Sequence, residues 1–207
     1  MTIIDYSELN EFQIDVLREL GNIGAGNAAT SLSSMLNCRV DITVPVVKIL
    51  SFREVTDALG GPEHTIIGLL VTLDGDVTGM IMFLMQEDFA QMILRNLLGI
   101  KIENFADLDE LGYSALREIS NIMAASYVNA VSQMTNLRIN ISVPDISVDM
   151  AGAILSVPAI YFADISDRII FIEDQFETET DHALSHVLLI PEVESLKKIL
   201  TNLGIEI

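Results

Sequence analysis

Two pairs of side chains in this sequence have the types and spacing to position a water molecule. Each pair is a glutamate followed three residues later by an asparagine: Glu19 with Asn22, and Glu118 with Asn121. An asparagine amide cannot act as a general base, but it can hold a water by donating and accepting hydrogen bonds. Such positioning suits phosphoryl transfer, in which much of the protein's contribution is placement and electrostatics. The glutamate can pair with a lysine of a macromolecular substrate and fix its approach.

Both pairs lie in stretches that we predict to be long helices. A third polar residue, Asp15 or Ser114, precedes each glutamate by four positions. At about 100° per residue these offsets span roughly 60°, so each trio shares one helix face. We expect another face of the first helix to pack on the protein and leave the acid and amide exposed. Its apolar residues are Ile14, Leu17, Leu20, Ala28, Leu32 and Met35.

Three glycines, Gly21, Gly24 and Gly26, interrupt the first helical pattern. Each costs on the order of 1 kcal/mol relative to alanine, so a missing side chain must be useful. Two uses remain open and do not exclude each other: close approach of a partner surface, or an internal crossing against the second repeat. The second copy carries small residues at or near the matching places, namely Ser120, Ala124 and Ala125.

We find no second set of catalytic or metal-binding residues. The sequence lacks a phosphate-binding loop ending in Gly-Lys-Ser/Thr, a His-Glu-x-x-His and a Cys-x-x-Cys. On a strand, His182 and His186 would stand about 13 Å apart, too far to share an ion, so a surface or core-edge position is predicted. A cluster of five acidic residues near the C-terminal end lacks the residue order of a calcium-binding loop, so we predict a solvated loop there. It comprises Glu173, Asp174, Glu177, Glu179 and Asp181.

The composition describes an acidic globular chain. It has 207 residues, 30 of them acidic and 11 basic, which gives a net charge of −19. Such a charge repels nucleic acids and anionic membrane surfaces, so we expect neither as a partner. The apolar segments 66–73 and 80–85 are too short to span a bilayer. A single cysteine, Cys38, and an N-terminus without secretory features lead us to expect a cytoplasmic protein.

The chain contains an internal repeat. Shifting it by 99 positions superposes residues 12–45 on 111–144 with 13 identities, more than two unrelated helices would share. The identical residues of the first copy are Leu17, Arg18, Glu19, Asn22, Ile23, Ala25, Ser33, Met35, Asn37, Arg39, Ile42, Val44 and Pro45.

Each repeat is predicted to fold as helix, strand, short helix, hairpin and helix. For the first repeat we predict helices at 7–37, 52–59 and 87–98, a strand that begins at 39, is ended by Pro45 and continues over 46–50, and strands at 65–73 and 77–85. Residues 1–6 would be loosely paired or frayed. For the second we predict a short helix at 148–157, strands at 168–176 and 182–190, and a closing helix at 191–204 with proline in its first turn.

Neither repeat could bury the apolar face of its strands alone. We therefore predict an α+β fold in which the two repeats, about 7–100 and 106–207, share one sheet related by a pseudo-twofold axis. The whole chain, residues 1–207, would be a single domain, and the two polar helices would display two equivalent sites.

The repeated motif closely resembles the CheC family of chemotaxis phosphatases. The resemblance rests on Asp15-x-x-x-Glu19-x-x-Asn22 and Ser114-x-x-x-Glu118-x-x-Asn121, on the run 21–30, on the Val-Pro after each first strand and on the hairpin 75–79. It covers nearly the whole chain. It implies hydrolysis of the aspartyl phosphate of the response regulator CheY, with each asparagine directing water and each glutamate contacting CheY. Asp15 and Ser114 would be substrate-binding residues.

The resemblance also implies what accompanies the chain. Magnesium would be carried by CheY, with no cofactor on this protein, and the deamidase CheD would be a second partner. Asp149, at the start of the predicted helix around 150–155, matches the region through which such proteins hold CheD. We expect a monomer. The glycine-rich run occurs only in the first half, so a single active site is an alternative to two.

Two alternatives stay open at this point. Glutamate and asparagine on one helix are usually only part of a solvated face, although their recurrence on two helices favours function. The related flagellar switch proteins FliM and FliY suggest a non-catalytic binding module. A FliM-like domain should lack the paired glutamate and asparagine, and a FliY-like chain adds a C-terminal switch domain for which 207 residues are expected to leave no room.

Overall fold

A computed structural model describes residues 5–162 and 166–205. The helices are α1 (Glu11–Leu36), α2 (Phe52–Ala58), α3 (Glu87–Leu98), α4 (Glu110–Thr135), α5 (Ala151–Tyr161) and α6 (Val193–Asn202), with 3-10 turns η1 (Tyr6–Glu8) and η2 (Phe105–Asp107). The strands are β1 (Asp41–Ile42), β2 (Val46–Ser51), β3 (Thr65–Gly75), β4 (Gly79–Met85), β5 (Ile139–Ile141), β6 (Asp145–Met150), β7 (Arg168–Glu177) and β8 (His182–Pro191).

The strands form one antiparallel sheet in which the two repeats exchange strands. Its order is β1-β7-β8-β4-β3-β5, with β2 also paired to β7 and β6 also paired to β3. Strands β4 and β8 are neighbours at the centre. Each hairpin therefore takes its outer neighbour from the other repeat. When each strand is replaced by its equivalent in the other repeat, β1 by β5, β7 by β3 and β8 by β4, the strand order is the same from either edge. This symmetric sheet, with its helices, confirms the predicted α+β fold. The assignment of the whole chain to a single domain stays a prediction.

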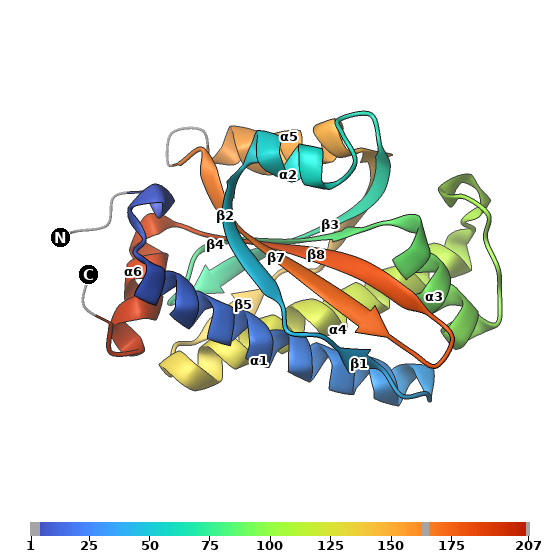
Figure 1. The fold of residues 1–207 in the computed structure, drawn as a ribbon, viewed down its shortest axis with the longest axis horizontal. Helices are drawn as coiled ribbons and strands as arrows, with labels where there is room; N and C mark the ends of the chain where they lie inside the picture. The colour runs from blue at the N-terminus through green and yellow to red at the C-terminus, as the bar shows by residue number, and fades with distance from the viewer. Residues whose placement is uncertain (1–4, 163–165, 206–207) are drawn as a thin grey trace.

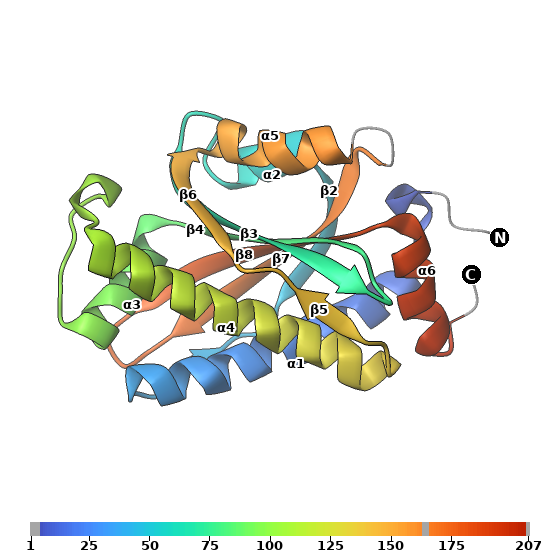
Figure 2. The same ribbon diagram turned by 180° about the vertical axis from the view of Figure 1, so that it is seen from behind.

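The central strands are buried on both faces. In β4, Ile81, Phe83 and Met85 join a large core with α1, α3, α4 and α6. The intervening residues from Met80 to Leu84 join a smaller core beneath α2 and α5. Figures 1 and 2 show these two helical layers on opposite faces of the sheet. Burial on both faces explains why the sequence here is a continuous apolar run without alternation.

The two long helices begin and end in the same way. The side chain of Asn10 caps α1 in a reciprocal arrangement with Gln13, and that of Asp109 caps α4. Both helices end at an asparagine in the left-handed region, Asn37 with φ 49° and Asn136 with φ 56°. Asparagine tolerates that conformation better than most residues, so the repeated asparagine ends both helices at equivalent points.

Helices α1 and α4 pack closely because one glycine leaves room. A Cβ placed on Gly24 would lie 2.6 Å from Cδ1 of Tyr127 in α4, whereas one placed on Gly26 would meet nothing within 4 Å. The internal crossing is therefore the use of Gly24. The glycine at 26 faces open space beside Asn22.

A buried polar pair lies behind this crossing. The Tyr127 hydroxyl donates a hydrogen bond to Oδ2 of Asp174 in β7. Burial raises the pKa of Asp174 to about 7, although the Tyr127 hydrogen bond opposes the shift. Opposite it in register is Ser185, and within the described residues neither the Ser185 hydroxyl nor Oδ1 of Asp174 has a partner. The prediction of a solvated acidic loop was thus wrong for Glu173, Asp174 and Glu177, which lie in β7, because the apolar alternation of that strand continues through them.

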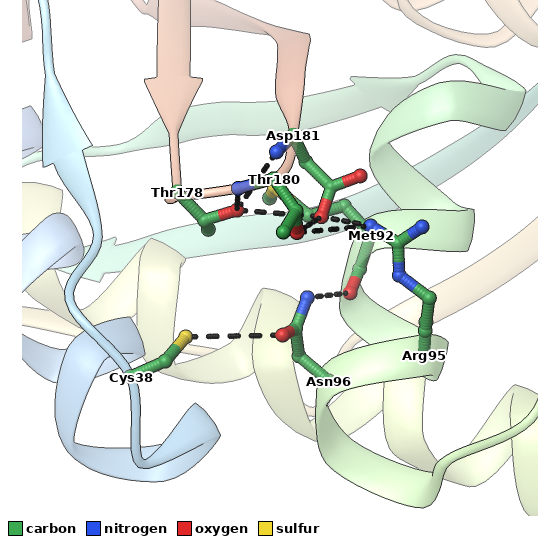
Figure 3. A network of polar contacts seen from close by, with 7 residues as sticks. All are labelled: Cys38, Met92, Arg95, Asn96, Thr178, Thr180 and Asp181. Atoms are coloured by element: carbon green, nitrogen blue, oxygen red, sulfur yellow. Dashed lines mark hydrogen bonds and ion pairs between the residues drawn. The ribbon is translucent and has the colours of Figure 1, made fainter.

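The turn between β7 and β8 is tied to the first repeat (Figure 3). Arg95 of α3 forms an ion pair with Asp181, whose carboxylate also accepts a 2.8 Å hydrogen bond from the Thr180 hydroxyl. Desolvation opposes ionisation, but these hydrogen bonds hold the pKa of Asp181 below its usual value. On the same helix, the Asn96 amide donates to the Met92 carbonyl at 2.8 Å.

Some predicted boundaries were wrong for identifiable reasons. The predicted break at Pro45, which has no N–H for the ladder, is confirmed, but β1 covers only Asp41–Ile42 and so begins later than the predicted residue 39. The short helix expected at 148–157 is α5, which begins at Ala151, because the alternation of β6 continues to Met150. Pro191 ends β8 and does not lie in the first turn of α6.

The N-terminal prediction was also wrong where the structure describes it. Residues 1–4 of the segment expected to fray lie outside the described residues. Tyr6 is buried, and its hydroxyl donates a hydrogen bond to the Pro191 carbonyl at the other end of the sequence.

We predict opposite effects for two glycine substitutions on α1. Gly26→Ala should raise the free energy of unfolding by up to about 1 kcal/mol, because the new methyl group meets open space and alanine favours a helix. Gly24→Ala should lower it by about 1–3 kcal/mol, because Tyr127 cannot move aside without breaking its bond to Asp174. Urea denaturation of both variants measures this, and equal effects would contradict the assigned crossing.

We also predict that Asp174 makes stability depend on pH. Between about pH 4 and 7 the folded protein keeps a proton on Asp174 that the unfolded chain loses, so this group's contribution falls as the pH rises through that window. The slope is at most about 1.4 kcal/mol per pH unit. The free energy of unfolding of Asp174→Asn, minus that of the wild type, should therefore increase from pH 4 to 7 and then level off. A difference that is constant with pH would contradict this.

Candidate functional site

The predicted polar faces of both long helices are exposed. Asp15, Glu19, Asn22, Ser114 and Glu118 are exposed, and Asn121 is half-buried. Within the described part of the chain, neither glutamate and neither asparagine of the two pairs has a hydrogen bond or an ion pair. The opposite face of α1 is packed as predicted, with Leu17, Leu20, Ala28 and Leu32 buried and Ile14 and Met35 half-buried.

The two pairs lie apart from each other. Helices α1 and α4 lie side by side and run in opposite directions, as both ribbon views show. Each Glu-Asn pair is in the N-terminal half of its helix, so the pairs lie toward opposite ends of this layer. The arrangement gives two separate candidate sites, each on one helix.

At the second site the pair lines an open groove of about 390 Å³. Its lining residues are Arg117, Glu118, Asn121, Ala125, Ile141, Ser142, Val143 and Pro144. The far wall is the corner between β5 and β6, which is held to β3 by two 3.0 Å hydrogen bonds. One runs from the Ser142 amide to the Thr72 carbonyl, and the other from the Thr72 amide to the Ser142 hydroxyl.

Each corner presents an apolar side chain to solvent. Val143 is 82% exposed, and the equivalent Val44 between β1 and β2 is 72% exposed. The first corner is also anchored to the sheet, since the Thr43 amide donates to the Gln175 carbonyl at 3.1 Å. These valines were visible as identical repeat positions, but the sequence did not place Val143 in the groove beside the second polar pair.

The sites differ in the charge around the shared arginine. In α1, Arg18 forms an ion pair with Asp15 one turn earlier. In α4, Ser114 occupies the place of Asp15, and Arg117 has no ion pair or hydrogen bond with any described residue. From the sequence, Arg18 and Arg117 were visible as an identical repeat position, but no role followed for either. The replacement of Asp15 by Ser114 was the difference between the repeats that could have indicated a role for Arg117.

Asp149 is not brought to either pair. It is exposed on β6, and its Oδ1 accepts a 2.7 Å hydrogen bond from the Met150 amide. It lines a separate hollow of about 370 Å³ between β3, β6 and α5, on the face of the sheet opposite α1 and α4. Beside it, α5 exposes Val157, Ile160 and Tyr161.

The two histidines were predicted at the surface or the core edge, and His182 has the predicted surface position, but His186 lies inside the core. His182 is exposed, whereas His186 is buried, stacks on Phe171 and lies 3.6 Å from a carboxylate oxygen of Glu173. Burial lowers the pKa of His186, against the influence of Glu173. Across residues 5–162 and 166–205, no three His, Cys, Asp or Glu side chains gather as a metal site would require. In the same residues, no helix combines the length and apolar content needed to cross a bilayer.

Comparison with known proteins identifies the family. A profile of the CheC-like family matches residues 12–49 and 111–148, and each matched segment contains one Glu-Asn pair. The CheY-P phosphatase CheC of Bacillus subtilis (strain 168) is 33% identical to this chain over 203 residues, which cover 96% of this chain and 97% of that protein. The chain belongs to the CheC-like family.

Solved structures share the fold of this CheC-like chain. The crystal structure of Thermotoga maritima FliY matches with a TM-score of 0.76 at 23% identity, covering 95% of this chain and 98% of that one. The FliM middle domain from H. pylori matches with a TM-score of 0.67 at 13% identity, covering 94% and 99%. At these identities the likeness shows the fold alone, so the activity of the CheC-like chain depends on its site.

Proposed function

We propose that this chain is a protein phosphatase that hydrolyses the aspartyl phosphate of a CheY response regulator. The observation that carries the proposal is the recurrence of a glutamate and an asparagine, without partners among the described residues, at equivalent surface places on α1 and α4, where only Asn121 is half-buried. The related Bacillus subtilis protein named CheY-P phosphatase CheC supports the choice of substrate.

In the proposed reaction, Asn22 or Asn121 orients one water for in-line attack. The amide oxygen accepts a hydrogen bond from the water and the amide N–H₂ donates another, so the water's free lone pair faces the phosphorus. The water oxygen bonds to phosphorus as the bond to the aspartyl oxygen breaks. The products are a free aspartate carboxylate and inorganic phosphate, which retains the protons of the water. Such a loose transition state requires positioning more than a strong base.

The glutamates fix the approach of the regulator. Glu19 and Glu118 are exposed one turn from the asparagines, where a carboxylate can pair with a lysine of the substrate. Asp15 and Ser114 extend the same contact face. We propose that magnesium is carried by CheY and that this chain contributes the water-positioning amide. The cytoplasmic location and the monomeric state stay predictions.

The competing function is a non-catalytic binding module. The FliM middle domain has the same fold, so the fold does not distinguish a phosphatase from a scaffold. The exposed Glu-Asn pairs favour the phosphatase, because a scaffold gains nothing from two equivalent amides left open to solvent.

We predict that Asn22→Ala combined with Asn121→Ala removes the acceleration of CheY-P decay. Without an oriented water the stimulated rate should fall by about 100-fold or more, toward the spontaneous rate. Release of inorganic phosphate from phosphorylated CheY in magnesium buffer measures it. The melting transition should be kept, because neither side chain is in the core.

Asn27→Ala provides the matched control. Asn27 is an exposed asparagine of α1 that lies about 140° around the helix from Asn22, so its loss should leave the rate unchanged. A wild-type protein that does not alter CheY-P decay would favour the binding module, and a double variant that remains active would contradict the assignment of the asparagines.

We further propose that CheD binds at Asp149 and the exposed face of α5. Met150 follows that carboxylate in the chain, and α5 exposes the apolar side chains of Val157, Ile160 and Tyr161. An acid next to exposed apolar residues suits a protein interface with one charged contact. The surface is separate from both Glu-Asn pairs, so CheD and CheY could bind together.

We predict that Asp149→Asn weakens CheD binding by about 10-fold through the loss of a charge-assisted hydrogen bond. CheY-P hydrolysis in the absence of CheD should be unchanged. Isothermal titration with purified CheD measures the affinity, with Asp57→Asn on α2 as an exposed carboxylate control. Equal affinities for Asp149→Asn and the wild type would exclude this role.

A further inference from the structure

The two sites are alike in their Glu-Asn pairs but not in their net charge. The first site holds two carboxylates and one guanidinium, from Asp15, Glu19 and Arg18. The second holds one of each, from Glu118 and Arg117, because Ser114 replaces the second acid. One substitution between the repeats therefore removes a negative charge from the second site.

Arg117 lies where it can reach a group held by Asn121. The two residues are four positions apart on α4, so their side chains are neighbours on the helix surface, about 5–6 Å apart at Cβ. Both line the groove against the β5–β6 corner. Arg117 has no ion pair or hydrogen bond within the described residues, so no contact must be broken before its guanidinium meets a ligand.

The negative charge of the proposed substrate favours a role for the Arg117 guanidinium in binding it. An aspartyl phosphate is anionic and this chain has a net charge of −19, so the two repel each other unless a cation lies at the point of contact. A guanidinium can bind phosphoryl oxygens through parallel hydrogen bonds and can stabilise charge that develops on them. At the first site Asp15 both occupies Arg18 and repels the same anion.

We propose that Arg117 is a substrate-binding residue of the second site that contacts the phosphoryl oxygens of the aspartyl phosphate, and that the residue three positions earlier controls whether the arginine is available. This inference rests on the proposed phosphatase function. Arg117 forms no covalent bond and transfers no proton. It holds the anion while water replaces the aspartyl oxygen on phosphorus.

Each site must be tested in isolation. In an Asn22→Ala background only the second site remains, and there Arg117→Ala should lower kcat/KM for CheY-P by about 10-fold. Arg117→Lys should retain part of the rate, and Ser114→Asp should lower it several-fold. In an Asn121→Ala background only the first site remains, and Asp15→Ser should raise its rate several-fold.

Two further measurements separate this role from a structural one. Arg117→Ala should weaken binding to the beryllium fluoride adduct of CheY, which mimics the aspartyl phosphate, more than binding to unmodified CheY. Its rate should also depend less on salt, because one charge contact is lost. Arg53→Ala on α2, an exposed arginine on the opposite face of the sheet, removes the same charge and should leave the rate unchanged.

The outcomes distinguish this inference from the function on which it rests. A wild-type protein that does not accelerate CheY-P decay overturns both. Acceleration by the wild type, with Arg117→Ala equal to its Asn22→Ala parent, overturns only the role of Arg117. An Asn22→Ala protein that is inactive while Asn121→Ala is active also overturns it, because the second site would then not work at all.

Discussion

The exchange of strands between the repeats is the constraint on which the rest of this structure depends. Strand β2 completes the hairpin of the second repeat, and β6 completes that of the first. The strand pairing of the sheet is complete only when both repeats are present. The two long helices therefore lie together on one face of that sheet. There Gly24 allows α4 to approach α1, and the polar stripes of both helices remain on the outside.

The polar groups of the molecule divide into two kinds. Tyr127 and Asp174 are buried and hydrogen-bonded to each other, so their role is to stabilise the fold. The Glu-Asn pairs are open and make no bonds within the described chain, so they are free to bind another molecule. Rigid helices hold these free groups in fixed geometry, which suits a reaction that depends on the placement of one water.

Local signals in the sequence predicted much of this fold. Helix α3 begins and ends where its acidic start and Gly99 indicated. The shared sheet was predictable because neither repeat could bury the apolar face of its strands alone. The exchange of strands was not predictable in this way, because partners far apart in the sequence, such as Leu70 with Asp145 and Val46 with Glu173, leave no local pattern. The burial of Asp174 was missed for a related reason, since its partner Tyr127 lies on another element.

The candidate site was predictable in its residues but not in its surroundings. The spacing of Glu19 and Asn22 on a helix was sufficient to place them on an exposed face. The groove wall at Val143 depends on how the β5–β6 corner is anchored to β3, which only the folded sheet determines. Arg18 is paired with an acid one helical turn earlier and Arg117 is not, because Ser114 replaces Asp15. This difference could have been found from the repeat alignment.

Strands β2 and β7 pair in the sheet but lie far apart in the sequence, which matters while the chain is being synthesised. Residues 46–51 leave the ribosome more than 100 residues before their partners at 168–173. Until then β2 has an unpaired edge, so the sheet is completed only near the end of translation. A nascent chain stalled before β7 would expose that edge and be a substrate for chaperones and a source of aggregation.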